Sequence, residues 1–490
     1  MKKLITLLLI ACMVLGLVAC GGNGAESGAA QDTQGGETGN VFMAGFGMKD
    51  ITPKESVPMA SYGDDKDRWS EGLLSYLEAR AVVLKDAEGN MLVFVIGDIT
   101  WAPKDLADRI RNDMAAELNI PVNNVIVSGT HTHNSVSASL VEFPSVVNFR
   151  EQYVKGMEEA IRMAVADLKP AEVYVGGVMT EGMNFVRRYF MDDGSLDGDN
   201  AYGTGTKRVE HESEADREMQ IMKIVREGGK DIVMTQFQAH PHLEGKLNLL
   251  SSQTVGAIRD ALEQKMDVHA FHWQGAAGNL NSRGSLEGEQ LFENSNKGRI
   301  AYGEKMYAYV KSVYNDLTKV ETGTIKVEEV VLTAKVNHTY DHLINEAKMV
   351  QDYFKAGHTA AETATYAHQL SAERNLDRRI NSYYHANRIV SNAGQGQTKE
   401  MVLYSWSFGE VAGVVIPYEL FDTSAMQIKQ ESPFVRTFIV GYSYPSYSGY
   451  IPTEEGFANG GYEADNSNYA PGTAEAMVEA YLEMLNKMHG

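Results

Sequence analysis

The sequence predicts a mixed, multi-layer α/β domain with long helices. Two observations support this prediction. From Val41 to about Val255 short apolar runs alternate with amphipathic stretches, which is the pattern of strands and helices taken in turn. Both cysteines, Cys12 and Cys20, precede this region, so the domain forms no internal disulfide and depends on a buried core. Roughly 450 residues suffice for such a core.

The first elements follow from local pattern. Residues 81–84 and 91–96 are apolar and flank a Gly-containing turn at 86–90, which predicts a β-hairpin. A helix is expected at about 104–118, then a strand at 125–127. Strand and helix alternation then continues with a helix near 150–168.

The rest of the chain predicts more strands and one helical region. Residues 189–216 are polar and rich in Gly and Asp, which indicates a long surface loop. Residues 341–392 are rich in helix-forming residues and contain no proline, which predicts two long helices. Further strands are expected at 172–178, 218–225, 232–238, 268–272, 410–416 and 437–440.

The amino end is typical of an export signal. Residues 1–19 have a basic start and a short apolar stretch, too short for a permanent membrane span. They end in Ala19-Cys20, which resembles a bacterial lipobox, so we expect a lipid anchor on Cys20 and an extracytoplasmic, membrane-attached protein. Residues 20–40 are predicted to be a flexible Gly-rich tether, and 41–490 the functional domain. The alternative is an ordinary secreted protein with a cysteine at this place.

The charge restricts the possible ligands. The formal net charge is −21, which argues against nucleic acid or anionic lipid as a ligand because phosphates would be repelled.

The tetrapeptide Thr130-His131-Thr132-His133 is the clearest candidate for chemistry. In an extended backbone, side chains at i and i+2 leave the strand on the same face, so both histidines can address one point. Imidazole is a common zinc ligand, and loops after strand ends often hold the site in open α/β sheets. The competing interpretation is two polar residues in a surface loop.

A second histidine pair follows the strand expected at 232–238. His240 is the candidate for a second nitrogen ligand, whereas for His242, which comes after Pro241, a loop histidine bonded to backbone is the favoured interpretation. Glu419 lies beyond a buried strand among apolar residues, where a carboxylate is costly unless it is paired or bound to a cation. Its alternative is a surface glutamate in a turn. The tyrosine-rich run 442–450 is interpreted mainly as packed aromatics.

Together these segments carry a resemblance to the neutral/alkaline non-lysosomal ceramidases. The resemblance extends from Gly45 to about Glu463, and its most specific parts are THTH at 130–133 and YIPT at 450–453 with the later Tyr-Glu pair. It implies a zinc-dependent amidohydrolase that cleaves an N-acyl-sphingoid base, a sphingolipid, into fatty acid and amine by means of metal-activated water. The zinc ligands that it implies are His131, His240, Glu419 and Tyr450.

The resemblance also implies three catalytic residues. His133 would bind the substrate or its transition state beside the metal, and Tyr462 would stabilise the oxyanion. Arg187 would meet the substrate, with Arg188 as the alternative. A mixed His, His, Glu and Tyr ligand set suits Zn²⁺.

The sequence departs from the family pattern at two places. Asn281 stands where the family has a serine important for activity, with Ser282 one residue later, so a mechanism that needs that hydroxyl is not expected. The carboxyl-terminal β-sandwich of longer ceramidases has no counterpart before Gly490, which indicates a smaller or more soluble substrate. Two alternatives stay open: a binding lipoprotein on the same fold, and a hydrolase of another bond, such as an ester or another N-acyl amide.

Overall fold

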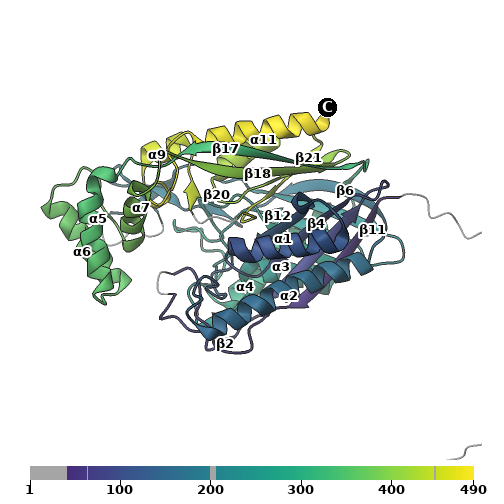
Figure 1. Cartoon of the computed structure of the whole chain (residues 1–490), viewed down its shortest axis with the longest axis horizontal. Helices are drawn as coiled ribbons and strands as arrows, with labels where there is room; N and C mark the ends of the chain where they lie inside the picture. The colour runs from purple at the N-terminus through teal and green to yellow at the C-terminus, as the bar shows by residue number, and fades with distance from the viewer. Residues whose placement is uncertain (1–40, 63–64, 199–205, 446–448) are drawn as a thin grey trace, which may run out of the picture. The chain divides into compact units, whose positions relative to one another are not determined.

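Two β-sheets stacked face to face form the centre of the fold, and helices cover both outer faces (Figure 1). The computed structural model describes residues 41–62, 65–198, 206–445 and 449–490. The signal peptide expected at 1–19 and the tether expected at 20–40 lie outside the described residues. No helix in the described part is long and apolar enough to cross a membrane.

The larger sheet has nine strands in the order β14-β12-β11-β6-β1-β3-β4-β5, with β16 paired to β6. Most neighbours are antiparallel, but β4 and β5 are parallel, as are β12 and β14. The strands are β1 (Met43–Asp50), β3 (Glu78–Lys85), β4 (Met91–Gly97), β5 (Val125–Gly129), β6 (Lys169–Met179), β11 (Glu218–Arg226), β12 (Ile232–Phe237), β14 (His269–Gln274) and β16 (Thr318–Val320).

The smaller sheet has four strands in the order β17-β18-β19-β21, in which β19 and β21 are parallel. Aromatic side chains fill the space between the two sheets, where Phe94 lies 5.0 Å from both Trp273 and Trp406 between ring centroids. The strands are β17 (Ile325–Lys335), β18 (Thr398–Phe408), β19 (Val411–Val415) and β21 (Arg436–Val440).

Alternation along the strands assigns each side chain to one layer. In β3, Val82 and Leu84 contribute to the core between the sheets, whereas Ala81 and Val83 face the helices on the other side. Because both faces are covered, these strands read as continuous apolar runs in the sequence. This accounts for the success of the hairpin prediction, since β3 and β4 pair antiparallel around residues 86–90.

Helices form the two outer layers of an α/β/β/α arrangement (Figure 1). The predicted helix at 104–118 is confirmed as α1, while the helix expected near 150–168 begins earlier, at Pro144 in the first turn. The large sheet is covered by α1 (Lys104–Leu118), α2 (Pro144–Ala166), α3 (Gln253–Met266) and α4 (Asn296–Val313), and the small sheet by α8 (Asp422–Glu431) and α11 (Thr473–His489).

The region 341–392 contains three helices rather than the two long ones predicted. Thr359 caps the second helix, because its side chain accepts a hydrogen bond from the Glu362 N–H and Glu362 reaches back to the Thr359 N–H. Gly357 just before it has a left-handed φ of 100°, which ends the first helix. The helices are α5 (Ile344–Lys355), α6 (Ala360–Glu373) and α7 (Tyr383–Ala393), preceded by a short 3-10 helix (Asp341–Leu343).

The surface loop predicted at 189–216 is also wrong in part. Its described residues form a small sheet in the order β10-β8-β9, and Tyr189 is fully buried. Polar composition concealed these short strands, although Tyr189 and Met191 of β8 are buried. They are β8 (Arg188–Met191), β9 (Leu196–Gly198) and β10 (Arg208–His211).

The remaining elements are short. They are β2 (Gly72–Leu73), β7 (Phe185–Val186), β13 (Leu249–Leu250), β15 (Leu280–Asn281), β20 (Glu419–Leu420), β22 (Tyr450–Ile451), α9 (Glu454–Asn459), α10 (Tyr462–Asp465) and a 3-10 helix (Val122–Asn124).

Candidate metal centre

The candidate site lies where strands of the two sheets end. His131 follows β5 and His240 follows β12, both in the large sheet, while Glu419 follows β19 of the small sheet. Backbone hydrogen bonds connect the sheets here, since the Gly129 N–H donates to the Tyr442 carbonyl at 3.0 Å. The segments that follow these strands thus meet at one place, and such loops after strand ends are where α/β folds often place their chemistry.

The position of His131 is set by its backbone conformation, by a hydrogen bond to the backbone and by ring stacking. Its φ is 61°, so the chain is not extended here, and strand alternation does not explain why it meets His133 as the sequence pattern suggested. The His131 Nδ1 lies 3.1 Å from the Thr100 carbonyl oxygen, and its ring stacks on Tyr442 at 3.9 Å between centroids. Because a carbonyl only accepts, Nδ1 carries the proton and Nε2 presents a lone pair.

His240 is fixed in the same tautomer. Its Nδ1 lies 2.8 Å from the Ala277 carbonyl oxygen and 3.0 Å from that of Leu280, so this nitrogen is also the donor. Burial holds the pKa of His240 well below its ordinary value and lowers the pKa of His131 to about 3. Both imidazoles are therefore neutral at pH 7, with Nε2 lone pairs directed away from the backbone.

Both lone pairs converge on the Glu419 carboxylate. Glu419 Oε2 lies 3.1 Å from His240 Nε2 and 3.6 Å from His131 Nε2. Three acceptors this close repel one another unless a cation or a proton lies among them. Burial raises the pKa of Glu419, whereas the nearby His131 and Arg187 lower it. Two imidazole nitrogens and one carboxylate form the donor set that Zn²⁺ prefers, so these residues fit a bound metal.

Tyr450 is placed beside Glu419 by strand pairing. The two residues are register partners in the parallel pair β20 and β22, so their side chains leave on the same face. The Arg187 guanidinium lies 5.4 Å from the Tyr450 ring centroid. Burial keeps the pKa of Tyr450 well above its ordinary value, whereas the nearby Arg187 charge lowers it.

His133 lies against the two other histidines. Its ring is 4.9 Å from that of His131 and 5.7 Å from that of His240. One nitrogen from each of these three residues lies within 4.8 Å of the others. Neither nitrogen of His133 has a hydrogen-bond partner in the described part of the chain, although both are buried. Burial keeps the pKa of His133 well below its ordinary value, so this ring is neutral and ready to donate or accept.

His242 lies beside the candidate site and not on the exposed surface of its loop. Its ring is half-buried, 4.8 Å from the ring of His133 and 6.5 Å from that of Tyr62. It contributes to the wall around His133, yet it stands outside the group of three histidines whose nitrogens lie close together.

Arg187 and Arg188 have different surroundings. Arg187 Nε donates to Glu463 at 2.9 Å and one of its terminal nitrogens donates to the Gly278 carbonyl at 2.9 Å. Arg188 is fully buried and pairs with Glu212 and Glu463 on the side away from Tyr450. Of the two, Arg187 is the one that contacts the candidate site, and it does so through Tyr450.

Tyr462 begins α10 at the end of a Gly-Gly turn. Its ring lies 5.6 Å from that of Tyr450, and Gly461 before it has a φ of 87°, which only glycine adopts without strain. Burial raises the pKa of Tyr462 to about 12, so its hydroxyl stays protonated at neutral pH.

Asn281 lies next to the metal centre in β15. It is buried and forms a backbone bridge with His240, and Ser282 after it is buried as well. An amide therefore occupies the place beside His240 that the family resemblance assigns to a serine.

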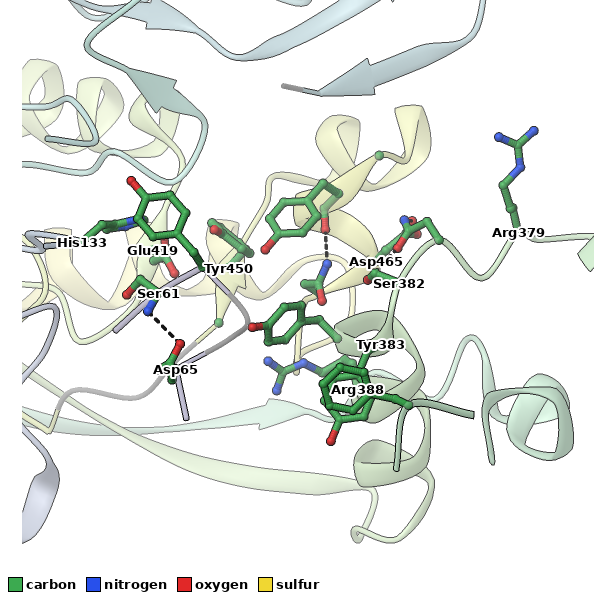
Figure 2. Close-up of a pocket in the computed structure, with 18 of the residues that line it drawn as sticks. Ser61, Asp65, His133, Arg379, Ser382, Tyr383, Arg388, Glu419, Tyr450 and Asp465 are labelled. Carbon is green, nitrogen blue, oxygen red and sulfur yellow. Dashed lines mark hydrogen bonds between the residues drawn. The ribbon is translucent and has the colours of Figure 1, made fainter. Parts of the chain in front are cut away.

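A cavity of about 1620 Å³ opens over these residues. His131, His133, Glu419, Tyr450 and Tyr462 line it, together with residues of the helical unit α5–α7. Figure 2 shows His133, Glu419 and Tyr450 grouped on one side of the cavity and Arg388 and Tyr383 on another. The metal centre is thus accessible to a ligand of considerable size.

Two contributions escaped the sequence reasoning. Tyr442 belongs to the run interpreted as packed aromatics, but its ring forms one side of His131 and its φ of 52° is left-handed. The carbonyl groups of Thr100, Ala277 and Leu280, which fix the histidine tautomers, belong to the backbone and leave no side-chain signal.

Comparison with known proteins agrees with this geometry. Residues 42–276 match the family described as neutral/alkaline non-lysosomal ceramidase, N-terminal. Neutral ceramidase 2 of Arabidopsis thaliana is 26% identical over 197 residues, which cover 38% of this chain and only 25% of that relative.

Two solved structures have the same fold. The crystal structure of neutral ceramidase from Pseudomonas aeruginosa superposes with a TM-score of 0.67 at 17% identity, covering 91% of this chain and 74% of that one. A structure described as ceramidase complexed with C2 gives a TM-score of 0.65 at 17% identity, covering 92% of this chain and 75% of that one. The chain therefore has the fold of the neutral ceramidase structures, and its residues 42–276, just under half of its length, match the neutral/alkaline ceramidase N-terminal family model.

Proposed function

We propose that this protein is a zinc-dependent amidohydrolase that cleaves a ceramide-like N-acyl amide into a fatty acid and an amine. The observation that carries the proposal is the convergence of the His131 and His240 Nε2 lone pairs on the Glu419 carboxylate. Such a group of acceptors is suited to a cation, and it lies at a large cavity in a ceramidase fold. Tyr450, the register partner of Glu419, is the fourth proposed ligand.

Zinc held by His131, His240, Glu419 and Tyr450 would supply a Lewis acid for the hydrolysis of the amide. The protein residues supply the proton transfers and the oxyanion contacts. His133 is neutral and lines the cavity with no protein partner in the described structure, so it can donate a hydrogen bond to the amide carbonyl. Tyr462 keeps its hydroxyl proton at neutral pH and donates a second one.

Arg187 acts on Tyr450 and not on the substrate directly. Its charge favours the ionised form of Tyr450, because the guanidinium lies against that ring and is held in place by Glu463. We infer that Arg187 prepares Tyr450 as an oxygen ligand. The proposal has no role for a serine nucleophile, which is consistent with Asn281 next to His240.

The deciding experiment combines metal content with turnover. Elemental analysis of the domain from Val41 onward should give about one zinc per chain, as a single site of this kind holds. The same protein should release fatty acid from a short-chain fluorescent ceramide and stop when a chelator is added. Zinc without release from ceramide or any other N-acyl amide would leave the binding lipoprotein as the better description, and absence of metal would refute the ligand set.

We further propose that the protein is lipid-anchored on Cys20 outside the cytoplasmic membrane. The support is the lipobox-like end of the signal sequence. Cys20→Ser should move the protein from the membrane fraction to the soluble fraction. Retention in the membrane fraction would contradict the anchor.

A further inference from the structure

The cavity contains a half-buried arginine that has no carboxylate counter-ion among the described residues. Arg388 projects from α7 and lines the cavity (Figure 2). One of its terminal nitrogens donates to the Asn468 side-chain oxygen, while its Nε is buried with no partner in the described structure. No carboxylate of the described residues forms an ion pair with it. A guanidinium that is desolvated in this way is costly unless an anion completes it.

The neighbouring acidic groups are committed elsewhere. Asp465 is neutralised by Arg378, whose terminal nitrogen lies 2.6 Å from its Oδ1, and it also accepts from Asn381. Glu419 interacts electrostatically with Arg388 but belongs to the metal centre. Burial lowers the pKa of Arg388, whereas the nearby Tyr462 and Glu419 raise it. Because Arg388 lines the cavity and its Nε has no partner in the described structure, a ligand in the cavity can supply the counter-ion.

The cavity lining mixes polar and apolar side chains on both sides. Beside His131 it includes Trp101, Val136 and Leu140, which offer apolar contacts to an acyl chain. The helical unit contributes Phe354 and Leu376 together with the cations Arg388 and Arg379. These cations offer contacts to an anionic group of a bound ligand.

From this arrangement we propose that the preferred substrate is an N-acyl amine whose amine portion carries an anionic group, a carboxylate or a sulfonate, which Arg388 binds. The net charge of −21 disfavours anionic surfaces at long range, but it is screened by salt and does not prevent one anionic group from pairing with Arg388 inside the cavity. The inference rests on the proposed amidohydrolase function and specifies its substrate class. The uncharged amine portion of a ceramide would leave Arg388 unpaired. A guanidinium is suited to this task because it stays charged when buried and donates two parallel hydrogen bonds to planar or tetrahedral oxyanions.

The test compares amides that differ in charge alone. N-dodecanoyltaurine and N-dodecanoylglycine carry a sulfonate and a carboxylate, whereas N-dodecanoylethanolamine is neutral and of similar size. We expect kcat/KM of the wild-type enzyme to be higher for the anionic amides. Arg388→Gln should lower the ratio of anionic to neutral kcat/KM roughly 10- to 100-fold, the size of a charge-assisted hydrogen bond. The anionic amide whose kcat/KM falls more in Arg388→Gln shows whether Arg388 prefers the sulfonate or the carboxylate.

Two variants control for folding and for general charge. Arg388→Lys keeps the charge, and we expect it to retain more of the ratio than Arg388→Gln. Arg374→Gln removes a cation from the same helical unit. Arg374 lies 3.6 Å from Glu346 and does not line the cavity. This variant should therefore keep the ratio of anionic to neutral kcat/KM within about 2-fold of the wild-type value, as expected for an exposed charge. Equal values for neutral and anionic amides, or an equal ratio in Arg388→Gln and wild type, would overturn the inference.

Failure of the proposed function gives a separate result. If no amide is hydrolysed, the amidohydrolase proposal fails, and calorimetric binding of N-dodecanoyltaurine decides about Arg388. Weaker binding to Arg388→Gln than to wild type, with no such difference for the ethanolamide, would retain the anion site. Equal binding of the taurine amide to both proteins would eliminate it.

Discussion

Removing His240 should abolish the stabilisation of this protein by zinc. His240 provides one of the two Nε2 lone pairs that face Glu419, so His240→Ala leaves an incomplete ligand set. Zinc at a free concentration a thousandfold above its Kd stabilises a native protein by about 4 kcal/mol. For roughly 450 residues the unfolding entropy near Tm is about 0.9 kcal/mol/K, which converts this energy into a Tm increase of about 4 °C.

The assay is differential scanning calorimetry in buffered zinc and in excess chelator, with elemental analysis of the same samples. Wild type should show the shift and His240→Ala should show less than about 1 °C of it. His242→Ala is the matched control, because His242 lies in the same segment but outside the group of three histidines, and it should keep both zinc and the shift. Loss of zinc from His242→Ala with retention in His240→Ala would refute the ligand assignment.

Three further changes test other parts of the site. Gly278→Ala should destabilise the fold by about 1–3 kcal/mol in urea denaturation, since a Cβ there would come within 2.3 Å of the Glu419 carbonyl oxygen; unchanged stability would show that this close approach is relaxed in solution. Tyr442→Leu should weaken zinc binding in a chelator competition by roughly 10- to 100-fold because His131 loses its stacked support, while Tyr442→Phe should stay within about 3-fold of wild type; equal effects of the two variants would contradict the role of the ring. Burial raises the pKa of Asp422 from 3.8 to about 6, so the native state binds the extra proton and stability from this group falls as the pH rises from about 4 to 6. Asp422→Asn should remove about 3 kcal/mol of this fall in the free energy of unfolding, measured by denaturation at about pH 4 and about pH 6. An unaltered pH profile in the variant would rule out Asp422 as the source of the fall.

Periodicity predicted the layers of the fold well where strands are buried on both faces. The hairpin of β3 and β4 and the helix α1 follow directly from apolar runs and from helical spacing. It failed for strands of three or four residues in a polar stretch, which are too short to show a period, as in the small sheet within 189–216. In the helical unit the composition indicated helix correctly, but the ends depended on a single cap at Thr359 and a left-handed Gly357.

The candidate site could be approached from the sequence only in part. His131 and His240 follow apolar strands, so the sequence places both at strand ends. Whether those two ends meet depends on the order of strands in the sheet, which local pattern does not contain. Glu419 and Tyr450 became candidates through the family resemblance, and their pairing in β20 and β22 explains why they meet. Arg388 carries no motif, since its importance comes from burial without a partner.

Because the proposed ligands come from both sheets, a bound metal would have a structural role as well. His131 and His240 extend from the large sheet, whereas Glu419 and Tyr450 belong to the segments that follow the strands of the small sheet. The apolar core between the sheets holds them face to face, but at the site itself the contacts are between acceptors that repel one another without a cation. A bound zinc would convert this repulsion into attraction and join the two sheets at the edge where the cavity opens. Metal loss should therefore loosen this edge first, before it affects the aromatic core around Trp273 and Trp406.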